Sequence, residues 1–183
     1  DGRIAVPGTM TSAYLLLKLL LMHFKFEVVP FDKVIEAVSG QSWEDFVASR
    51  ILKKVGMEGS SVRHSAADGT GNIATPHALV NGKVQPIAPF TSDNTNPAGG
   101  INSNAEDMAR WLLVQLAEGR LADGSRLFSQ ATARQLTTMV TPIPIGESAL
   151  ELLSIRPNFQ GYALGFSVRD YRGRKLVGHS GGL

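Results

Sequence analysis

Apolar residues recur at helical spacing in the first third of the chain, and small polar residues interrupt them. One apolar stripe stops at Gly40, a residue type that commonly ends helices. Ser42 and Asp45 then have the spacing of a capping box, which predicts a second helix that ends before Gly56. The apolar positions of this helix pair are Val34, Ile35, Val38, Trp43, Phe46, Val47 and Ile51. The pattern predicts two helices joined by a tight turn.

Helical spacing returns twice in the second half of the chain. The sequence SNAE predicts a helix that Ser103 caps and that closes at Gly119. A further helix is expected from about Ser129 to Val140, because Pro142 cannot continue it. Trp43 and Trp111 lie on apolar helix faces, so they are interpreted as core residues.

Near the end of the chain the hydrophobic period changes from helical to alternating. Apolar and other residues alternate from Tyr162 to Val168, the turn sequence DYRG follows, and Lys175 to His179 is expected to return as a partner strand. Earlier in the chain, the dipeptide Asn81-Gly82 predicts a two-residue hairpin. Helices followed by antiparallel strands indicate an α/β fold of the α+β type.

Composition excludes several classes of function. The chain has 183 residues, 43% hydrophobic residues, a formal charge of +2 and no cysteine. Lysine and arginine residues are scattered along the chain and form no run that would indicate a nucleic-acid-binding arm. The absence of cysteine excludes disulfides and thiolate metal sites. The apolar run from Tyr14 to Met22 is too short to cross a bilayer, so a buried or interfacial helix is expected and membrane association is not. A membrane-surface role for residues 1–32 stays open.

Three ordered stretches carry a resemblance to a known family. They read VIEAVSGQSWEDFVASRILKKVGM, NPAGGINSNAEDMARWLLVQL and GYALGFSVRDYRGRKLVGHSGG. Together they resemble the serine β-lactamase and penicillin-binding protein superfamily, on its class C and esterase-like side. The resemblance covers residues 33–183 as a partial β-lactamase-like domain, and residues 1–32 match poorly. It implies a β-lactamase/transpeptidase-like fold, with a helical portion and part of an antiparallel sheet, incomplete at both ends.

The resemblance also implies a set of site residues. His179-Ser180-Gly181 resembles the family's third motif, in which a strand beside a nucleophilic serine contacts the substrate. By that resemblance His179 and Ser180 face the substrate, Gly181 binds it, and the amide of Gly182 is an oxyanion donor. Two further substrate-binding candidates border the family's cleft, although turn formation explains them almost as well. They are Asn94 and Asn96.

The family's other two motifs are not evident in these residues. No S-x-x-K occurs in the 183 residues, and Ser12 is followed by a lysine only at Lys18, too far for helical pairing. A serine without an adjacent base is a poor nucleophile. By alignment, His23 stands where the family has its tyrosine and Lys25 where it has asparagine. His23 is therefore a candidate base, and an ordinary surface or core histidine is the alternative.

The sequence leaves two hypotheses for the function of this chain. The first is a segment of a serine hydrolase that acts through an acyl-enzyme on β-lactams, D-alanyl peptides or small esters, and is inactive as an isolated chain. Because histidine is mostly neutral at pH 7, His179 favours esters or peptides over penicillins. The second is a non-catalytic β-lactamase-like module for binding or scaffolding.

Cofactors, partners and compartment are expected as follows. No metal or cofactor is expected, because His64 and His77 have no recognised ligand spacing with Asp68 or Asp93. A small molecule or a peptide is the expected substrate, and no nucleic acid is expected. Self-association through an exposed sheet edge is a further expectation. The resemblance favours a periplasmic or secreted protein, and the chain itself has no signal-peptide pattern.

Overall fold

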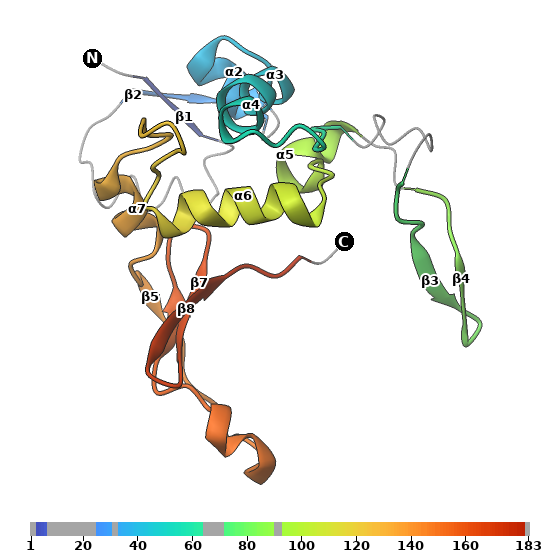
Figure 1. Ribbon diagram of the computed structural model, residues 1–183, viewed down its shortest axis with the longest axis vertical. Helices are drawn as coiled ribbons and strands as arrows, with labels where there is room; N and C mark the ends of the chain where they lie inside the picture. Colours follow the sequence, from blue (N-terminus) through green and yellow to red (C-terminus); the bar gives the residue numbers. More distant parts are fainter. Residues whose placement is uncertain (1–2, 7–24, 31–32, 64–71, 90–92, 182–183) are drawn as a thin grey trace. The chain divides into compact units, whose positions relative to one another are not determined.

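The computed structural model describes residues 3–6, 25–30, 33–63, 72–89 and 93–181 (Figure 1). The chain forms two compact units, residues 1–111 and 112–183, and the division falls within helix α6 (Ala105–Leu116). Among the described residues, no helix is both long enough and apolar enough to cross a membrane. The two units are described separately below.

The first unit contains the predicted helix pair. Helix α2 (Val34–Ser39) ends at Gly40, whose φ is 71°. Ser42 caps helix α3 (Trp43–Val47) by accepting a hydrogen bond of 3.1 Å from the amide of Asp45. The chain continues through a π-helical turn (Ala48–Leu52) and helix α4 (Lys53–Val55) to Gly56. The helix pair and its capping residue are confirmed, and the π-helical turn is an addition that the apolar spacing did not predict.

A small apolar core holds these helices together. Val47, Leu52 and Met57 are each at most 6% exposed. Partly buried residues pack around them, namely Trp43, Ile51, Val55, Val62 and Trp111. Burying one such aliphatic side chain contributes about 1.5–3 kcal/mol. The expectation that both tryptophans belong to a core is confirmed.

Helix α6 begins one residue later than expected. The side-chain oxygen of Asn104 accepts a hydrogen bond of 2.9 Å from the backbone N–H of Asp107, so Asn104 is the cap. The expected cap, Ser103, was wrong: its hydroxyl lies 2.7 Å from that of Ser60 instead. Backbone hydrogen bonds between Ser61 and Asn102 fix the chain just before Ser103, which directs its side chain to Ser60. A tertiary contact therefore decides which of two adjacent polar residues caps the helix.

The remaining elements of the first unit are short. Strands β1 (Arg3–Val6) and β2 (Lys25–Val28) pair in parallel, and β3 (His77–Val80) pairs with β4 (Lys83–Pro86) as a hairpin. The turn residues Asn81 and Gly82 both have positive φ, 52° and 75°, which confirms the predicted hairpin. A 3-10 turn (Asp93–Thr95) leads into helix α5 (Asn96–Gly99).

After the last part of α6, the second unit continues with helix α7 (Gln130–Leu136), which begins at the predicted position and is capped by Ser129. The helix ends at Leu136 rather than at Val140, so the predicted end was wrong. The hydroxyls of Thr137 and Thr138 bond back to the carbonyl oxygens of Ala133 and Arg134, and the chain then leaves as strand β5 (Thr141–Pro142). Pairing with the sheet therefore competes with continuation of the helix. A 3-10 helix (Leu150–Ile155) follows.

Four antiparallel strands form the sheet of this unit in the order β5-β6-β7-β8. The run from Tyr162 to Val168, expected as one strand, is two: β6 (Gln160–Tyr162) and β7 (Ser167–Tyr171). Gly165, with a φ of 88°, makes the tight turn between them. Strand β8 (Arg174–Gly178) returns after a second two-residue turn in which Arg172 and Gly173 both have positive φ.

The two faces of β7 differ in burial. Val168 and Asp170 are 2% and 6% exposed, whereas Ser167, Arg169 and Tyr171 lie on the exposed face.

Strands β5 and β6 approach each other closely within this sheet. A Cβ at Gly161 would lie 2.6 Å from the carbonyl oxygen of Thr141 and would meet the sulfur of Met139, so β6 can pair with β5 here only through glycine.

Candidate functional site

The predicted motif His179-Ser180-Gly181 directly follows strand β8, and all three residues are exposed. The ring of His179 lies edge-on to that of Tyr162, with centroids 6.3 Å apart and planes at 68°. Tyr162 is opposite Ser167 in the pairing of β6 with β7. The end of β8 therefore places an imidazole and a hydroxyl beside the sheet.

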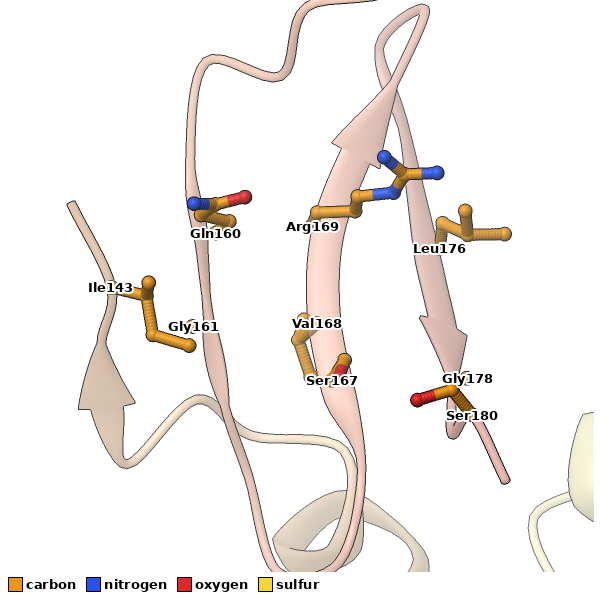
Figure 2. A pocket seen from close by; sticks show the side chains of 9 residues that line it. All are labelled: Ile143, Gln160, Gly161, Ser167, Val168, Arg169, Leu176, Gly178 and Ser180. Carbon is orange, nitrogen blue, oxygen red and sulfur yellow. The ribbon is translucent and has the colours of Figure 1, made fainter. Parts of the chain in front are cut away.

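Ser180 also borders a hollow of about 300 Å³ on this sheet (Figure 2). Its polar lining residues are Gln160, Ser167, Arg169 and Ser180, and its apolar ones include Ile143 and Leu176. Sequence reasoning identified Ser180 and missed the other three polar residues. Alternation along β7 predicts that Ser167 and Arg169 share a face, but only the strand register brings Gln160 and Leu176 opposite Arg169.

The polar lining of this hollow combines two hydroxyls, one guanidinium and the Gln160 side chain, whose amide nitrogen already donates to the carbonyl oxygen of Pro144 at 2.9 Å. Arg169 makes no ion pair within the described part of the chain, and its guanidinium is exposed on the same face as Ser167. Arg174 lies opposite Tyr171 on that face. Hydroxyl and guanidinium donors suit a ligand that presents oxygen acceptors.

Asp170 lies on the opposite face of β7 and supports this end of the sheet. Its carboxylate accepts three hydrogen bonds: from the side-chain amide of Asn158 at 2.8 Å, from the backbone N–H of Asn158 at 2.5 Å and from that of Phe159 at 3.1 Å. The Asn158 side chain, followed by the backbone N–H of Phe159, lowers the pKa of the Asp170 carboxyl below its ordinary value. The carboxylate thereby fixes the segment that leads into β6.

Of the two predicted asparagines, only the Asn96 side chain is described. It is 1% exposed and donates to the carboxylate of Glu44 at 2.7 Å. Within the described residues its Oδ1 has no hydrogen-bond partner. The substrate-binding roles of Asn94 and Asn96 stay predictions.

Three other predicted residues lie outside the described part of the chain. They are His23, His64 and Gly182. His77 is described, and one of its ring nitrogens lies 2.8 Å from the carbonyl oxygen of Thr75. No group of three or more His, Asp or Glu residues suited to a metal ion occurs in the parts of the chain with described positions.

Comparison with known proteins gives consistent matches. Residues 29–183 match the family described as beta-lactamase. Penicillin-binding protein 4 of Amycolatopsis lactamdurans is 24% identical over 152 residues, which are 81% of this chain and 38% of that protein. The chain thus spans well under half of this curated relative.

Solved structures have the same fold. The octameric penicillin-binding protein homologue from Pyrococcus abyssi matches with a TM-score of 0.61 and 25% identity, over 81% of this chain and 30% of that one. A D-stereospecific amidohydrolase from Streptomyces sp. matches with a TM-score of 0.61 and 19% identity, over 94% of this chain and 50% of that one. The mixed helical and antiparallel architecture is therefore that of the β-lactamase/transpeptidase fold, of which this chain covers part.

Proposed function

This chain belongs to the β-lactamase family, and we propose that it carries the strand-end part of a serine hydrolase site that acts on acyl compounds through an acyl-enzyme. The proposed substrates are β-lactams, D-alanyl peptides or small esters. One observation carries the proposal: His179-Ser180-Gly181 is exposed directly after β8, and Ser180 borders the hollow of about 300 Å³. An extended strand end offers amide donors for an oxyanion and pairing groups for a substrate backbone.

The relatives support the substrate classes. One is a penicillin-binding protein, and one neighbour in fold is an amidohydrolase specific for D-configured substrates. Both names point to acyl transfer at a carbonyl carbon, with D-amino acids or β-lactams as the acyl part. The exposed Arg169 guanidinium at the hollow suits the oxygen acceptors that such compounds carry.

The 183 residues lack the motif that carries the nucleophilic serine in this family. None of the serines is followed three residues later by lysine, which is the spacing that pairs the nucleophile with a base in the family's S-x-x-K motif. We propose that this chain binds such compounds reversibly and does not itself form the acyl bond. The same observation supports a second candidate, a binding or scaffold module of β-lactamase fold that has no hydrolytic role.

Intact-mass spectrometry tests the covalent step. The chain is incubated with a fluorophosphonate probe and, separately, with benzylpenicillin, and an unmodified mass is expected in both. A stoichiometric adduct would contradict the proposed inactivity of this chain and would also exclude the non-catalytic candidate. Peptide mapping would then name the serine, and loss of the adduct in Ser180→Ala would assign it to Ser180.

Amide NMR titration tests the proposed binding role. We expect benzylpenicillin or a D-alanyl-D-alanine ester to shift the backbone amides of His179, Ser180 and Gly181, and expect Ser180→Ala to weaken the effect. Ser154→Ala is the matched control, because Ser154 is exposed in the 3-10 helix and does not border the hollow. If neither compound shifts the three amides of the folded chain, the proposed function is wrong.

A further inference from the structure

His179 follows strand β8 at a point where the pairing of β8 with β7 has ended. Strand β7 begins at Ser167, and Ser167 is opposite Gly178, so Gly178 is the last residue of β8 that pairs with β7. His179 is exposed one residue beyond this pair. An exposed side chain beyond a strand ladder has several rotamers available unless a neighbouring group restricts it. The orientation of the imidazole therefore depends on what its ring contacts.

Tyr162 supplies such a contact. The centroids of the Tyr162 and His179 rings lie 6.3 Å apart, and the ring planes meet at 68°. Aromatic rings whose centroids are about 4.5–7 Å apart attract each other in this edge-to-face arrangement, because the positive edge of one ring meets the negative face of the other. The contact therefore favours one orientation of the imidazole over the others.

The backbone of Tyr162 is held by strands on both sides. Strand β6 is an inner strand of the sheet, and Tyr162 is opposite Thr141 of β5 and opposite Ser167 of β7. Its carbonyl oxygen accepts a hydrogen bond of 2.9 Å from the backbone N–H of Val140. The Tyr162 side chain is 37% exposed, so its ring is available to a neighbour. A residue fixed within the sheet thus contacts His179, which lies beyond it.

Small residues fill the row between the two rings. Residues opposite each other in paired strands share a face, so Tyr162, Ser167 and Gly178 form one row across β6, β7 and β8. Two strand spacings of about 4.8 Å separate the first residue of this row from the last. Ser167 has a small side chain and Gly178 has none, and Figure 2 shows both on their neighbouring strands. No bulky side chain of this row therefore separates Tyr162 from His179.

We infer that Tyr162 is a positioning residue for His179: its ring holds the imidazole, at the end of β8, in the orientation in which it meets the acyl compound. This inference rests on the proposed function, because it assigns Tyr162 a role at the same site. Ser180 is the next residue and borders the hollow, so holding His179 also limits how the chain turns into Ser180. Restricting both residues before a ligand arrives removes part of the ordering cost of binding.

Aromatic NMR of the chain without ligand tests the ring contact. We expect a nuclear Overhauser effect between the two rings and a ring-current shift of the His179 ring protons. Tyr162→Leu should abolish both signals, and Tyr162→Phe should keep both because it keeps the ring. Tyr171→Leu is the matched control: Tyr171 is 40% exposed in the same sheet, and its ring contacts Arg172. Amide exchange of Val168 verifies that the sheet of each variant is intact. If Tyr162→Leu leaves the His179 ring shifts unchanged, the inference is wrong, whether or not a ligand binds.

Ligand titration tests what this positioning contributes to binding. With benzylpenicillin or a D-alanyl-D-alanine ester, Tyr162→Leu should raise the dissociation constant about threefold to tenfold, and Tyr162→Phe should restore the value of the unmodified chain. A Tyr162→Leu variant that has an intact sheet and binds as tightly as the unmodified chain would overturn the inference while the proposed function stands. If the unmodified chain binds neither compound, the proposed function fails first, and the role of Tyr162 at that site fails with it even where the ring contact is present.

Discussion

The helical core around Leu52 and the four-stranded sheet that carries His179 bury their apolar residues in different ways. In the helical core, three residues at most 6% exposed are surrounded by partly buried side chains from several segments. The sheet buries Ala163 and Val168 on one face, whereas Tyr162 and Leu176 on the other face remain 37% and 44% exposed. The helical region is thus stabilised mainly by shared apolar packing, and the sheet depends more on its turns and on hydrogen bonds such as those of Asp170.

The largest expected effect on stability comes from removing a buried side chain from the helical core. Leu52→Ala should lower the free energy of unfolding by about 3 kcal/mol, because it removes a side chain that is 6% exposed. Urea unfolding followed by tryptophan fluorescence measures this, since both tryptophans of the chain pack against the core. Leu116→Ala is the matched control: Leu116 is 82% exposed, and its loss should change stability by less than about 0.5 kcal/mol. Equal effects of the two substitutions would show that this core does not stabilise the fold.

The next effect concerns the polar support of the sheet. Asp170→Asn should release Asn158 and Phe159, because an amide replaces a carboxylate that accepts three hydrogen bonds. Hydrogen exchange of the Asn158 and Phe159 amides at pH 7 measures the loss of protection. Glu151→Gln, an exposed carboxylate in the 3-10 helix, is the control and should leave both amides protected. Unchanged protection in Asp170→Asn would contradict the supporting role of the carboxylate.

The same carboxylate gives the sheet a defined pH dependence. Because the fold lowers the pKa of Asp170, the folded state favours the ionised form. Its stabilising contribution is fully present above the ordinary carboxyl pKa of about 4 and is lost as the pH falls through the lowered value. The unmodified chain should therefore lose more stability than Asp170→Asn between pH 5 and pH 2. A parallel fall of both curves in acid unfolding would exclude Asp170 as its source.

A smaller effect tests the turns of the sheet. Gly173 has a φ of 76° and open space at its Cβ position, so Gly173→Ala introduces conformational strain without a clash. The expected cost is about 1 kcal/mol, measured as urea unfolding by circular dichroism. Gly146 also has open space but no positive φ, so Gly146→Ala should not destabilise the chain. If both substitutions cost the same, the turn conformation is not what stabilises this hairpin.

The smallest effect distinguishes the two adjacent candidate caps of α6. Asn104→Ala should lower the free energy of unfolding by about 1 kcal/mol. It should also speed hydrogen exchange at the Asp107 amide, which loses the hydrogen bond that it donates to the Asn104 side chain. Ser103→Ala should leave that amide protected, since the Ser103 hydroxyl contacts Ser60. Faster exchange at Asp107 in Ser103→Ala alone would restore Ser103 as the cap.

Local signals in the sequence predicted those elements whose causes are local. The cap at Ser42, the start of a helix near Ser129 and the hairpin at Asn81-Gly82 were predicted correctly, because each depends on residues within a few positions. The errors share a different cause. Contact with Ser60 moved the cap of α6 to Asn104, and pairing with the sheet ended α7 early. Propensity alone does not contain such tertiary contacts.

The candidate site divides in the same way. The resemblance pointed to Ser180, because a short motif is visible in one stretch of sequence. Arg169 and Gln160 were missed, because they join Ser180 around the hollow only through the register of three strands. A slip of one residue would turn the Arg169 side chain to the other face of the sheet, so no single stretch of sequence could assign it.

The close approach of β5 to Gly161 also restricts how this sequence can vary. At that position even a methyl group would meet Met139 and the Thr141 carbonyl oxygen, while at Gly178, in the same sheet, a methyl group would meet nothing within 4 Å. Two glycines that look alike in the sequence thus differ in what they tolerate: a methyl group at the second would disturb none of the described neighbours, whereas one at the first would require a strand to move.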